Sequence, residues 1–330
     1  MQQNATHSLT KQDYRQKWME GLDHEIGFWQ HWIHSQGQGF GEDFKVRLDP
    51  QTPLQDHIHP LLDHLPAGSL RLLDVGAGPL TALGKIYRSQ ALDIIAVDPL
   101  ADYYDQILRK AQLNPPVRTT WCHGELLEER FQPSSFDLVF SQNALDHSYD
   151  PYAIIKSMIR LTKVGHYVLL EHRQNEAEHE QYQGLHQWNF AMEQGDLVIW
   201  NPSAQLNVSQ SLAQYVDIQI HYIADVDWLN IQMKKLKDLP SAAVMDQDDL
   251  SMNQGDQSLP NELVHREAEI TRLTSELSGV QAELDTVYRS RSYRAIKKYW
   301  YFMDHSTVGK IIKKLKGSRP ESETQETHGF

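Results

Sequence analysis

The chain is poor in cysteine and contains no long apolar run. Of its 330 residues only Cys122 is a cysteine, so no internal disulfide and no multi-cysteine metal or iron–sulfur site can form. Charged side chains interrupt the first thirty residues, which excludes the continuous apolar core of a signal peptide. No stretch reaches the roughly 18 apolar residues that a membrane span needs. We therefore expect a cytoplasmic protein that is not integral to a membrane.

Basic residues are scarce overall, with 31 Lys or Arg against 44 Asp or Glu and a net charge of −13. Nucleic acid is disfavoured as the main partner, because phosphate binding needs a basic face. The charge is unevenly distributed, since residues 289–319 hold ten Lys or Arg and a single acid, Asp304. This asymmetry suggests separate roles for the two ends of the chain.

The N-terminal region has the pattern of an amphipathic helix. Thr10 and Asp13 have the spacing of a variant capping box. Apolar residues then recur at three- and four-residue intervals: Tyr14, Trp18, Leu22, Ile26, Trp29 and Ile33. The pattern predicts a helix over Lys11–Ser35, whose aromatic stripe either packs on the main domain or covers a substrate as a lid.

From Leu70 onwards, short apolar runs alternate with helical patterns. The predicted strands are Leu70–Val75, Asp93–Val97, Val117–Cys122, Phe136–Ser141 and His166–Glu171. The predicted helices between them are Leu80–Ser89, Ala101–Gln112 and Pro151–Thr162. Strands this continuously apolar have both faces buried, as in a parallel sheet covered by helices on either side. The predicted fold class is α/β, a doubly wound Rossmann-like sheet.

The remaining segments predict further parts of the chain. Strands at Leu197–Trp200 and Val216–Ile223 would complete the sheet, and apolar residues spaced by seven from Leu263 to Leu284 predict a coiled coil. The predicted organisation is an N-terminal helical or lid region (1–69), a ligand-binding domain (70–235), a disordered linker (236–261), a coiled coil (262–288) and a basic aromatic tail (289–330).

A glycine loop follows the first predicted strand. Gly76 and Gly78 let the backbone turn sharply and approach a ligand at the carboxyl edge of the sheet. Asp98 ends the second strand, where its carboxylate can accept hydrogen bonds from ribose hydroxyls. Dinucleotide sites have a third glycine where this chain has Thr81, and Asp74 would repel phosphate. The loop therefore predicts a nucleoside cofactor with an amino group or a sulfonium.

Five motifs in this region resemble those of the class I S-adenosylmethionine-dependent methyltransferases, and they occur in the same order. They are LLDVGAGP (Leu72–Pro79), AVDP (Ala96–Pro99), HGELLEERF (His123–Phe131), FDLVFSQNALDH (Phe136–His147) and VGHYVLLEH (Val164–His172). The resemblance implies S-adenosylmethionine as the cofactor. It also implies roles for eight residues: Asp74, Gly76 and Gly78 around the methionine moiety, Asp98 at the ribose, Leu100 and Glu125 beside the adenine, and Gln142 and Asn143 near the reactive methyl group.

Four further segments resemble methyltransferases associated with bacterial cell-surface polysaccharide synthesis. They are EIGFWQHW (Glu25–Trp32), DPLADYY (Asp98–Tyr104), NALDHSYDP (Asn143–Pro151) and GLHQWNF (Gly184–Phe190). This implies O-methylation of a sugar in a glycan or its lipid-linked intermediate. A small-molecule methyltransferase and a non-catalytic scaffold in glycan assembly stay open as alternatives. Trp188 and Tyr182 offer flat faces for a sugar ring, and core packing explains them equally well.

Methylation of a sugar hydroxyl calls for a general base, because the hydroxyl is a weak nucleophile. His147 follows the fourth predicted strand, His172 follows the fifth, and His186 lies in the GLHQWNF segment. Each is a candidate base, with a structural histidine as the alternative. Asp146, Glu171 and His172 could instead ligate a divalent ion, but no tight metal-ligand spacing is present, so we predict no metal site.

The two C-terminal segments predict partners. The coiled coil indicates self-association, and we expect a homo-oligomer. In the tail, aromatic residues such as Tyr299 and Phe302 lie near one helical face, while basic residues such as Arg294 and Lys298 lie largely away from it. Such a helix fits the surface of an anionic membrane, which suggests peripheral association with the inner face of the cell membrane. A solvated tail without a partner is the alternative.

Overall fold

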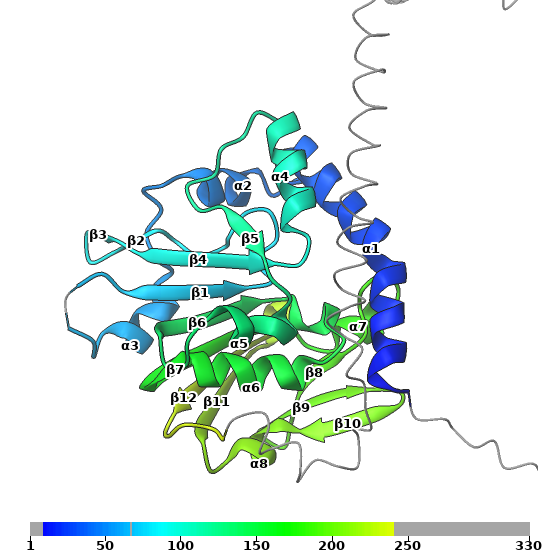
Figure 1. Cartoon of the computed structure of the whole chain (residues 1–330), viewed down its shortest axis with the longest axis vertical. Helices are drawn as coiled ribbons and strands as arrows, with labels where there is room; N and C mark the ends of the chain where they lie inside the picture. Colours follow the sequence, from blue (N-terminus) through cyan, green and yellow to red (C-terminus); the bar gives the residue numbers. More distant parts are fainter. Residues whose placement is uncertain (1–8, 67, 241–330) are drawn as a thin grey trace, which may run out of the picture. The chain divides into compact units, whose positions relative to one another are not determined.

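The computed structural model describes residues 9–66 and 68–240, so the predicted coiled coil and basic tail lie outside the described residues. A seven-stranded sheet forms its centre, in the order β11-β12-β7-β6-β1-β4-β5 (Figure 1). Its strands are β1 (Arg71–Val75), β4 (Asp93–Asp98), β5 (Thr119–Trp121), β6 (Phe136–Gln142), β7 (Thr162–Arg173), β11 (Val216–Ile223) and β12 (Trp228–Lys235).

The sheet is parallel over its first five strands in sequence and antiparallel at one side. β5, β4, β1, β6 and β7 pair in parallel, whereas β12 runs antiparallel to both β7 and β11. Apolar side chains of the inner strands, such as Leu73 and Val139, are fully buried. Burial on both faces explains the continuous apolar runs and confirms the predicted Rossmann-like α/β fold.

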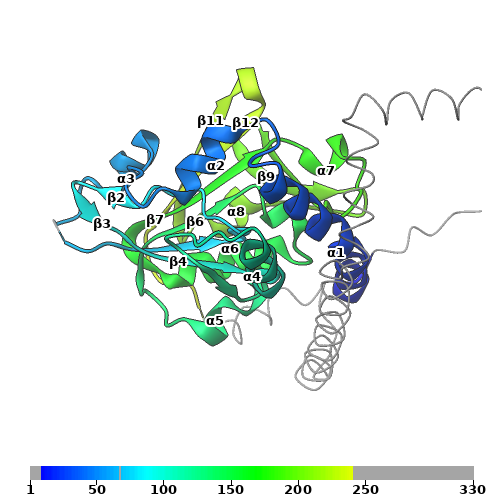
Figure 2. The same ribbon diagram turned by 90° about the horizontal axis from the view of Figure 1, so that it is seen from above.

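Helices cover both faces of the sheet (Figure 2). Ile155 and Ile159 of α6 join one buried cluster with Val139 and Val168 of the sheet. Leu61 and Leu62 of α3 join a second cluster with sheet residues that include Leu138 and Leu169. The helices after α1 are α2 (Gly41–Leu48), α3 (His59–Leu62), α4 (Ala101–Lys110), α5 (Leu127–Arg130), α6 (Pro151–Leu161), α7 (Glu176–His179) and α8 (Val208–Leu212).

The predicted N-terminal helix is present as α1 (Lys11–His34), and its capping box forms as expected. The Asp13 N–H donates to the Thr10 hydroxyl over 3.3 Å, and the Thr10 N–H donates to the Asp13 carboxylate over 2.7 Å. In Figure 1, α1 lies beside the carboxyl ends of β1 and β4. The hydrogen bond between the Tyr14 hydroxyl and Asn201 ties its first turn to β9.

The predicted helix over Leu80–Ser89 is wrong. This segment forms a loop and the short hairpin of β2 (Ile86–Tyr87) and β3 (Gln90–Ala91). Its backbone pairs with an earlier segment, since the N–H groups of Lys85 and Ile86 donate to the Thr52 carbonyl. Gly84 permits this approach, because a Cβ atom there would overlap the Pro53 carbonyl. Long-range backbone pairing therefore outweighs the local helical pattern.

The later strands divide between two sheets. Leu197–Trp200 was expected to complete the central sheet but belongs to a separate sheet of β8 (Asn189–Glu193), β9 (Asp196–Asn201) and β10 (Ala204–Asn207). The predicted strand Val216–Ile223 is β11, at the edge of the central sheet. β12 was not predicted, and it inserts between β7 and β11.

β12 ends on a buried lysine. Lys235 is fully buried, and its ammonium donates to the carbonyl oxygens of Thr162 and Arg160 over 2.7 and 3.1 Å. Beyond it, Leu239 is buried and the Arg160 guanidinium donates to the Pro240 carbonyl. Of the predicted linker, only residues 236–240 lie within the described part of the chain. No helix in that part is long and apolar enough to cross a membrane.

Candidate functional site

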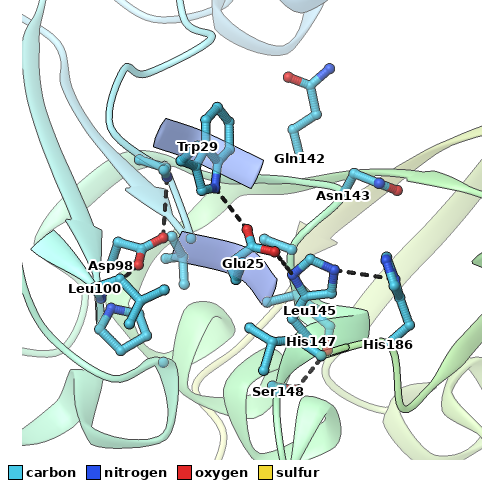
Figure 3. A pocket seen from close by; sticks show the side chains of 18 of the residues that line it. Glu25, Trp29, Asp98, Leu100, Gln142, Asn143, Leu145, His147, Ser148 and His186 are labelled. Carbon is cyan, nitrogen blue, oxygen red and sulfur yellow. Dashed lines mark hydrogen bonds and ion pairs between the residues drawn. The ribbon is translucent and has the colours of Figure 1, made fainter. Parts of the chain in front are cut away.

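A pocket of about 480 Å³ opens at the carboxyl ends of β1, β4 and β6. Open α/β sheets bind ligands at this edge, and the volume falls in the range of small-molecule sites. Seven of the eight residues predicted to bind the cofactor line it: Gly76, Gly78, Asp98, Leu100, Glu125, Gln142 and Asn143. Two of the three predicted catalytic histidines, His147 and His186, line it as well (Figure 3).

The two glycines of the loop cannot be replaced without closing this pocket. Gly76 and Gly78 have φ angles of +73° and +60°, which non-glycine residues rarely adopt. A Cβ atom on Gly76 would overlap the Cβ of Ala144, and one on Gly78 would lie 2.8 Å from the ring of Trp29. The loop therefore forms a cradle that is open only because both side chains are absent.

Asp98 lies at the base of the cradle with its carboxylate held from two sides. The Gly78 N–H donates to Oδ2 over 3.1 Å, and the Leu100 N–H donates to Oδ1 over 2.8 Å. Burial raises the pKa of Asp98 to about 7, although these two N–H groups act in the opposite direction. The Tyr104 hydroxyl also interacts with this carboxylate, whose oxygens keep acceptor capacity for ligand hydroxyls.

Asp74 does not line the pocket, contrary to the role that the resemblance implied. It is buried beneath the glycine loop, where its carboxylate accepts a 2.5 Å hydrogen bond from the Thr81 hydroxyl. Burial raises the pKa of Asp74 to about 6, against the opposing effect of this bond. Thr81 in turn accepts from the Leu83 N–H, so Asp74 stabilises the loop rather than contacting a ligand.

Glu125 lines the pocket, but one of its carboxylate oxygens accepts hydrogen bonds from the backbone. Its Oε1 accepts from the backbone N–H groups of Tyr149 and Asp150, which lead into α6. Burial raises the pKa of Glu125 to about 7. Asn143 is similarly engaged, because its side-chain oxygen accepts from the Arg173 N–H over 3.1 Å. These two contacts fix the loops that border the pocket.

Helix α1 supplies one side of the pocket. Trp29 lies against Gly78, and its indole N–H donates to Oε1 of Glu25 over 2.7 Å. The other oxygen of Glu25 lies 3.9 Å from Nδ1 of His147, so Glu25 stands between the tryptophan and the histidines (Figure 3). The helix therefore both packs on the domain and borders the site, which combines the two interpretations left open by the sequence.

Two of the predicted histidines meet an aspartate opposite Asp98. His186 Nδ1 lies 2.7 Å from Oδ2 of Asp146 and 3.1 Å from Nε2 of His147. Burial would lower the pKa of His186, but the hydrogen bond and charge of Asp146 outweigh it and raise the pKa. For Asp146, burial alone would raise the pKa. The three nearby imidazoles outweigh this effect and lower the pKa to about 2.

His172 is not placed to act on a substrate. It is fully buried and stacks on Phe190 with ring centroids 4.1 Å apart. Burial lowers the pKa of His172 to about 4, so the ring is neutral near pH 7. It lies under Asp146, with its Nδ1 4.0 Å from Oδ1 of that carboxylate. The expectation that His172 is a general base is therefore wrong, because the side chain does not reach the pocket.

The two aromatic residues proposed as sugar platforms also lie elsewhere. Trp188 is buried and packs on Tyr14 with ring centroids 4.7 Å apart. Tyr182 accepts a hydrogen bond at its hydroxyl from Asn189 and does not line the pocket. The aromatic residues that do line it are Trp18, Phe28, Trp29, Tyr104 and Trp228.

Several acidic pocket residues carried no clear signal in the sequence. Glu176 and Glu180 line the pocket from α7 and the residue that follows it. Glu25 occurs in a motif that suggested a family but not a role. Only contacts between distant segments reveal these residues, because nothing in their local spacing distinguishes them from solvated acids.

Comparison with known proteins finds similarity to methyltransferases. Residues 73–170 match the family described as a methyltransferase domain. An uncharacterised methyltransferase of Schizosaccharomyces pombe is 32% identical over 105 residues, which make up 30% of this chain and 38% of that protein. The match thus spans little more than a third of the length of that relative.

Two solved methyltransferase structures are similar to the chain at low sequence identity. A putative methyltransferase of Haloferax volcanii, solved with the activator Trm112, is 14% identical with a TM-score of 0.36, covering 63% of this chain and 97% of that one. A SAM-dependent methyltransferase of Methanosarcina mazei is 16% identical with a TM-score of 0.32, covering 56% and 100%. Residues 73–170 therefore form a methyltransferase domain, and the family match indicates S-adenosylmethionine as its cofactor.

Proposed function

We propose that the chain O-methylates a sugar hydroxyl of a cell-surface glycan or of its lipid-linked intermediate. The observation that carries this proposal is the group formed by Asp146, His147 and His186. The two histidines line the pocket on the side away from Asp98 (Figure 3), and Asp146 is buried behind them. A hydroxyl is a weak nucleophile, and it needs such a group close to the transferred methyl. A methyl acceptor that is already nucleophilic would not need it.

The residues present fit the cofactor. The cradle at Gly76 and Gly78 has room for the methionine moiety, Asp98 has lone pairs for the ribose hydroxyls, and Leu100 offers an apolar contact to the adenine. When bound, S-adenosylmethionine supplies an electrophilic methyl group on a sulfonium. The chain's own part is to hold the acceptor in line with that methyl and to exclude water.

Protonation of Asp98 gives a testable pH dependence. The carboxylate accepts hydroxyl donors better than the acid, so S-adenosylhomocysteine affinity should fall by up to about tenfold as the pH is lowered from 8 to 6 through the pKa of about 7. The stability of the free protein should change in the opposite direction. Because the folded-state pKa is raised above 3.8, folding favours the protonated form, and this contribution is lost as the pH rises through about 7.

Calorimetric titrations at several pH values measure this effect. Asp98→Asn is the matched control, because it keeps an acceptor oxygen but cannot titrate. Its affinity should be lower and nearly constant over the same pH range. If the variant keeps the full pH dependence, then Glu125, which also has a pKa of about 7, is the group responsible.

The acceptor is proposed to react at His147 and His186. Both side chains line the pocket, and Asp146 holds His186 from beneath through the 2.7 Å contact. The aromatic faces of Trp18, Phe28 and Trp228 border the same pocket, and flat faces of this kind stack on sugar rings. Acidic residues between them, such as Glu176, can accept hydrogen bonds from further hydroxyls.

The cellular setting is part of the proposal. The basic aromatic tail would hold the domain at the anionic inner face of the cell membrane, and the coiled coil would make it a homo-oligomer. Both segments lie outside the described residues, so their support is the sequence pattern alone. The full chain should bind anionic vesicles, and a chain truncated after Asn261 should not. Equal vesicle binding by the two would refute the membrane part.

Two other functions remain as outcomes of a direct assay. The chain would be a small-molecule methyltransferase if free metabolites, but no glycan fraction, accept the methyl group. It would be a non-catalytic scaffold if cofactor binds and no fraction is methylated. Glu176 and the two imidazoles line the same pocket, so a small-molecule acceptor would be polar. The same groups favour an enzyme over a non-catalytic scaffold.

The assay uses S-adenosylmethionine with a radiolabelled methyl group and a lipid-linked oligosaccharide extract. We expect label in the glycan fraction, recovered after acid hydrolysis as an O-methyl sugar, because an ether survives conditions that cleave esters. The Asp98→Ala variant is the control for cofactor-dependent transfer. Label confined to protein or to free small molecules would overturn the glycan assignment.

A further inference from the structure

We propose that Asp146, His147 and His186 bind a divalent transition-metal ion, with zinc as the first candidate. Asp146 and His147 belong to the turn at Leu145–His147, which follows β6, and His186 lies before β8. Each residue directs one ligand atom towards the other two. The sequence shows no such site because His186 is 39 residues from His147, far outside the short spacings of common metal motifs.

The three ligand atoms have the separations of a metal-bound set. Oδ2 of Asp146 lies 2.7 Å from Nδ1 of His186 and 3.5 Å from Nε2 of His147, and the two nitrogens are 3.1 Å apart. With metal–ligand bonds of about 2.0–2.2 Å, neighbouring ligands at tetrahedral or octahedral angles are about 2.8–3.6 Å apart. The atoms need to move only by tenths of an ångström to share one ion.

Hydrogen bonds alone cannot satisfy both contacts of Nδ1 of His186 at the same time. Nδ1 of His186 is within hydrogen-bond distance of both Asp146 and His147, but a ring nitrogen carries either one proton or one lone pair. If it donates to Asp146, it has no lone pair for a proton on Nε2 of His147. A cation at the centre would use the lone pairs of all three atoms at once.

The surroundings fit a cation that remains open to a ligand. Asp146 is buried, and its Oδ1 has no hydrogen-bond partner among the described residues. The two histidines line the pocket, so the remaining coordination positions face its interior. Behind His147, Oε2 of Glu25 lies 3.9 Å from Nδ1, on the side where metal-bound histidines commonly donate to a carboxylate.

The donor set selects the class of ion. Two imidazoles and one carboxylate suit zinc, iron, cobalt or manganese, whereas Mg²⁺ prefers oxygen ligands and retains its waters. Three protein ligands with open positions are the arrangement of catalytic rather than structural zinc. The role of the ion rests on the proposed function: with both imidazoles coordinated, the ion rather than a free histidine would hold and polarise the acceptor oxygen beside the cofactor.

The test is a calorimetric titration of Zn²⁺ into the untagged, chelator-treated full chain, with bound metal measured by mass spectrometry. We expect one Zn²⁺ per chain, not displaced by excess Mg²⁺. Asp146→Asn and His186→Gln should each weaken binding by more than about 100-fold, since even second-shell changes cost 10–100-fold. Absence of Zn²⁺ binding, or equal binding by the parent and these variants, would overturn the proposal.

Matched variants separate this site from other histidines. His179→Gln changes a half-exposed histidine that lies 3.4 Å from Asp227, outside the pocket, and it should bind Zn²⁺ as the parent does. If Asp146→Asn fails to fold, His147→Gln and His186→Gln carry the test, because both side chains lie at the pocket wall. The titration contains neither cofactor nor acceptor, so its result is independent of whether the proposed glycan methylation is correct.

Discussion

Replacing Asp98 by alanine is expected to weaken S-adenosylhomocysteine binding by at least about 100-fold in a calorimetric titration. Hydrogen bonds to a charged group contribute about 1.5–3 kcal/mol each, and the carboxylate is placed to accept two from the ribose. The substitution also removes the acceptor that holds the N–H groups of Gly78 and Leu100. The glycine loop therefore loses both a ligand contact and its own support.

Asp93 provides the matched control for this experiment. It begins the same strand that Asp98 ends, is half exposed, and contacts only Arg71 among the charged groups of the described chain. Asp93→Ala should bind S-adenosylhomocysteine as the parent does. Undiminished binding by Asp98→Ala would show that the second strand does not end at the ribose, and the assignment of the cofactor pocket would fail with it.

Replacing Gly76 by valine is expected to destabilise the fold by roughly 2–4 kcal/mol and to abolish cofactor binding. The φ of +73° is strained for any β-branched residue, and the new side chain would overlap Ala144. For a domain of this size, the melting temperature should fall by roughly 5–15 °C. Differential scanning calorimetry measures the first effect, and titration with S-adenosylhomocysteine measures the second.

Two further variants separate the loss of stability due to backbone strain from the loss due to the overlap with Ala144. Gly195 has a φ of +92°, but a Cβ atom there would meet nothing within 4 Å, so Gly195→Val reports the backbone strain alone. The double variant Gly76→Ala with Ala144→Gly removes the overlap and should recover part of the stability lost by Gly76→Ala. If Gly76→Val melts at the same temperature as the parent, then neither the positive φ of Gly76 nor its closeness to Ala144 limits the side chain at this position.

The strands of the sheet could be predicted where burial of both faces requires a continuous run of apolar residues. The runs that include Leu72–Val75 and Phe136–Ser141 are apolar on both faces, and both are strands. β12 escaped prediction because Asn230 interrupts its apolar pattern and Lys235 ends it, and both are buried with partners from β7. A polar residue that is satisfied only by distant groups cannot be distinguished locally from a solvated one.

The cofactor half of the pocket was more predictable than the acceptor half. Gly76, Gly78 and Asp98 act through local backbone geometry at the ends of consecutive strands, which leaves a fixed spacing in the sequence. The side of the pocket that we propose for the acceptor depends on Glu25, Asp146 and His186, which come from three distant segments. Its assembly depends on how α1 and the segment before β8 close over the sheet, and no short-range pattern encodes that closure.

The docking of α1 also bears on the order in which the protein becomes functional. The hydrogen bond between Tyr14 and Asn201 joins residues 187 positions apart, so α1 packs on a strand that lies much later in the chain. Contacts of such long sequence separation form slowly, because a large loop must close before they stabilise anything. The wall that contains Glu25 and Trp29 is therefore expected to close only after β9 is available to pack against α1.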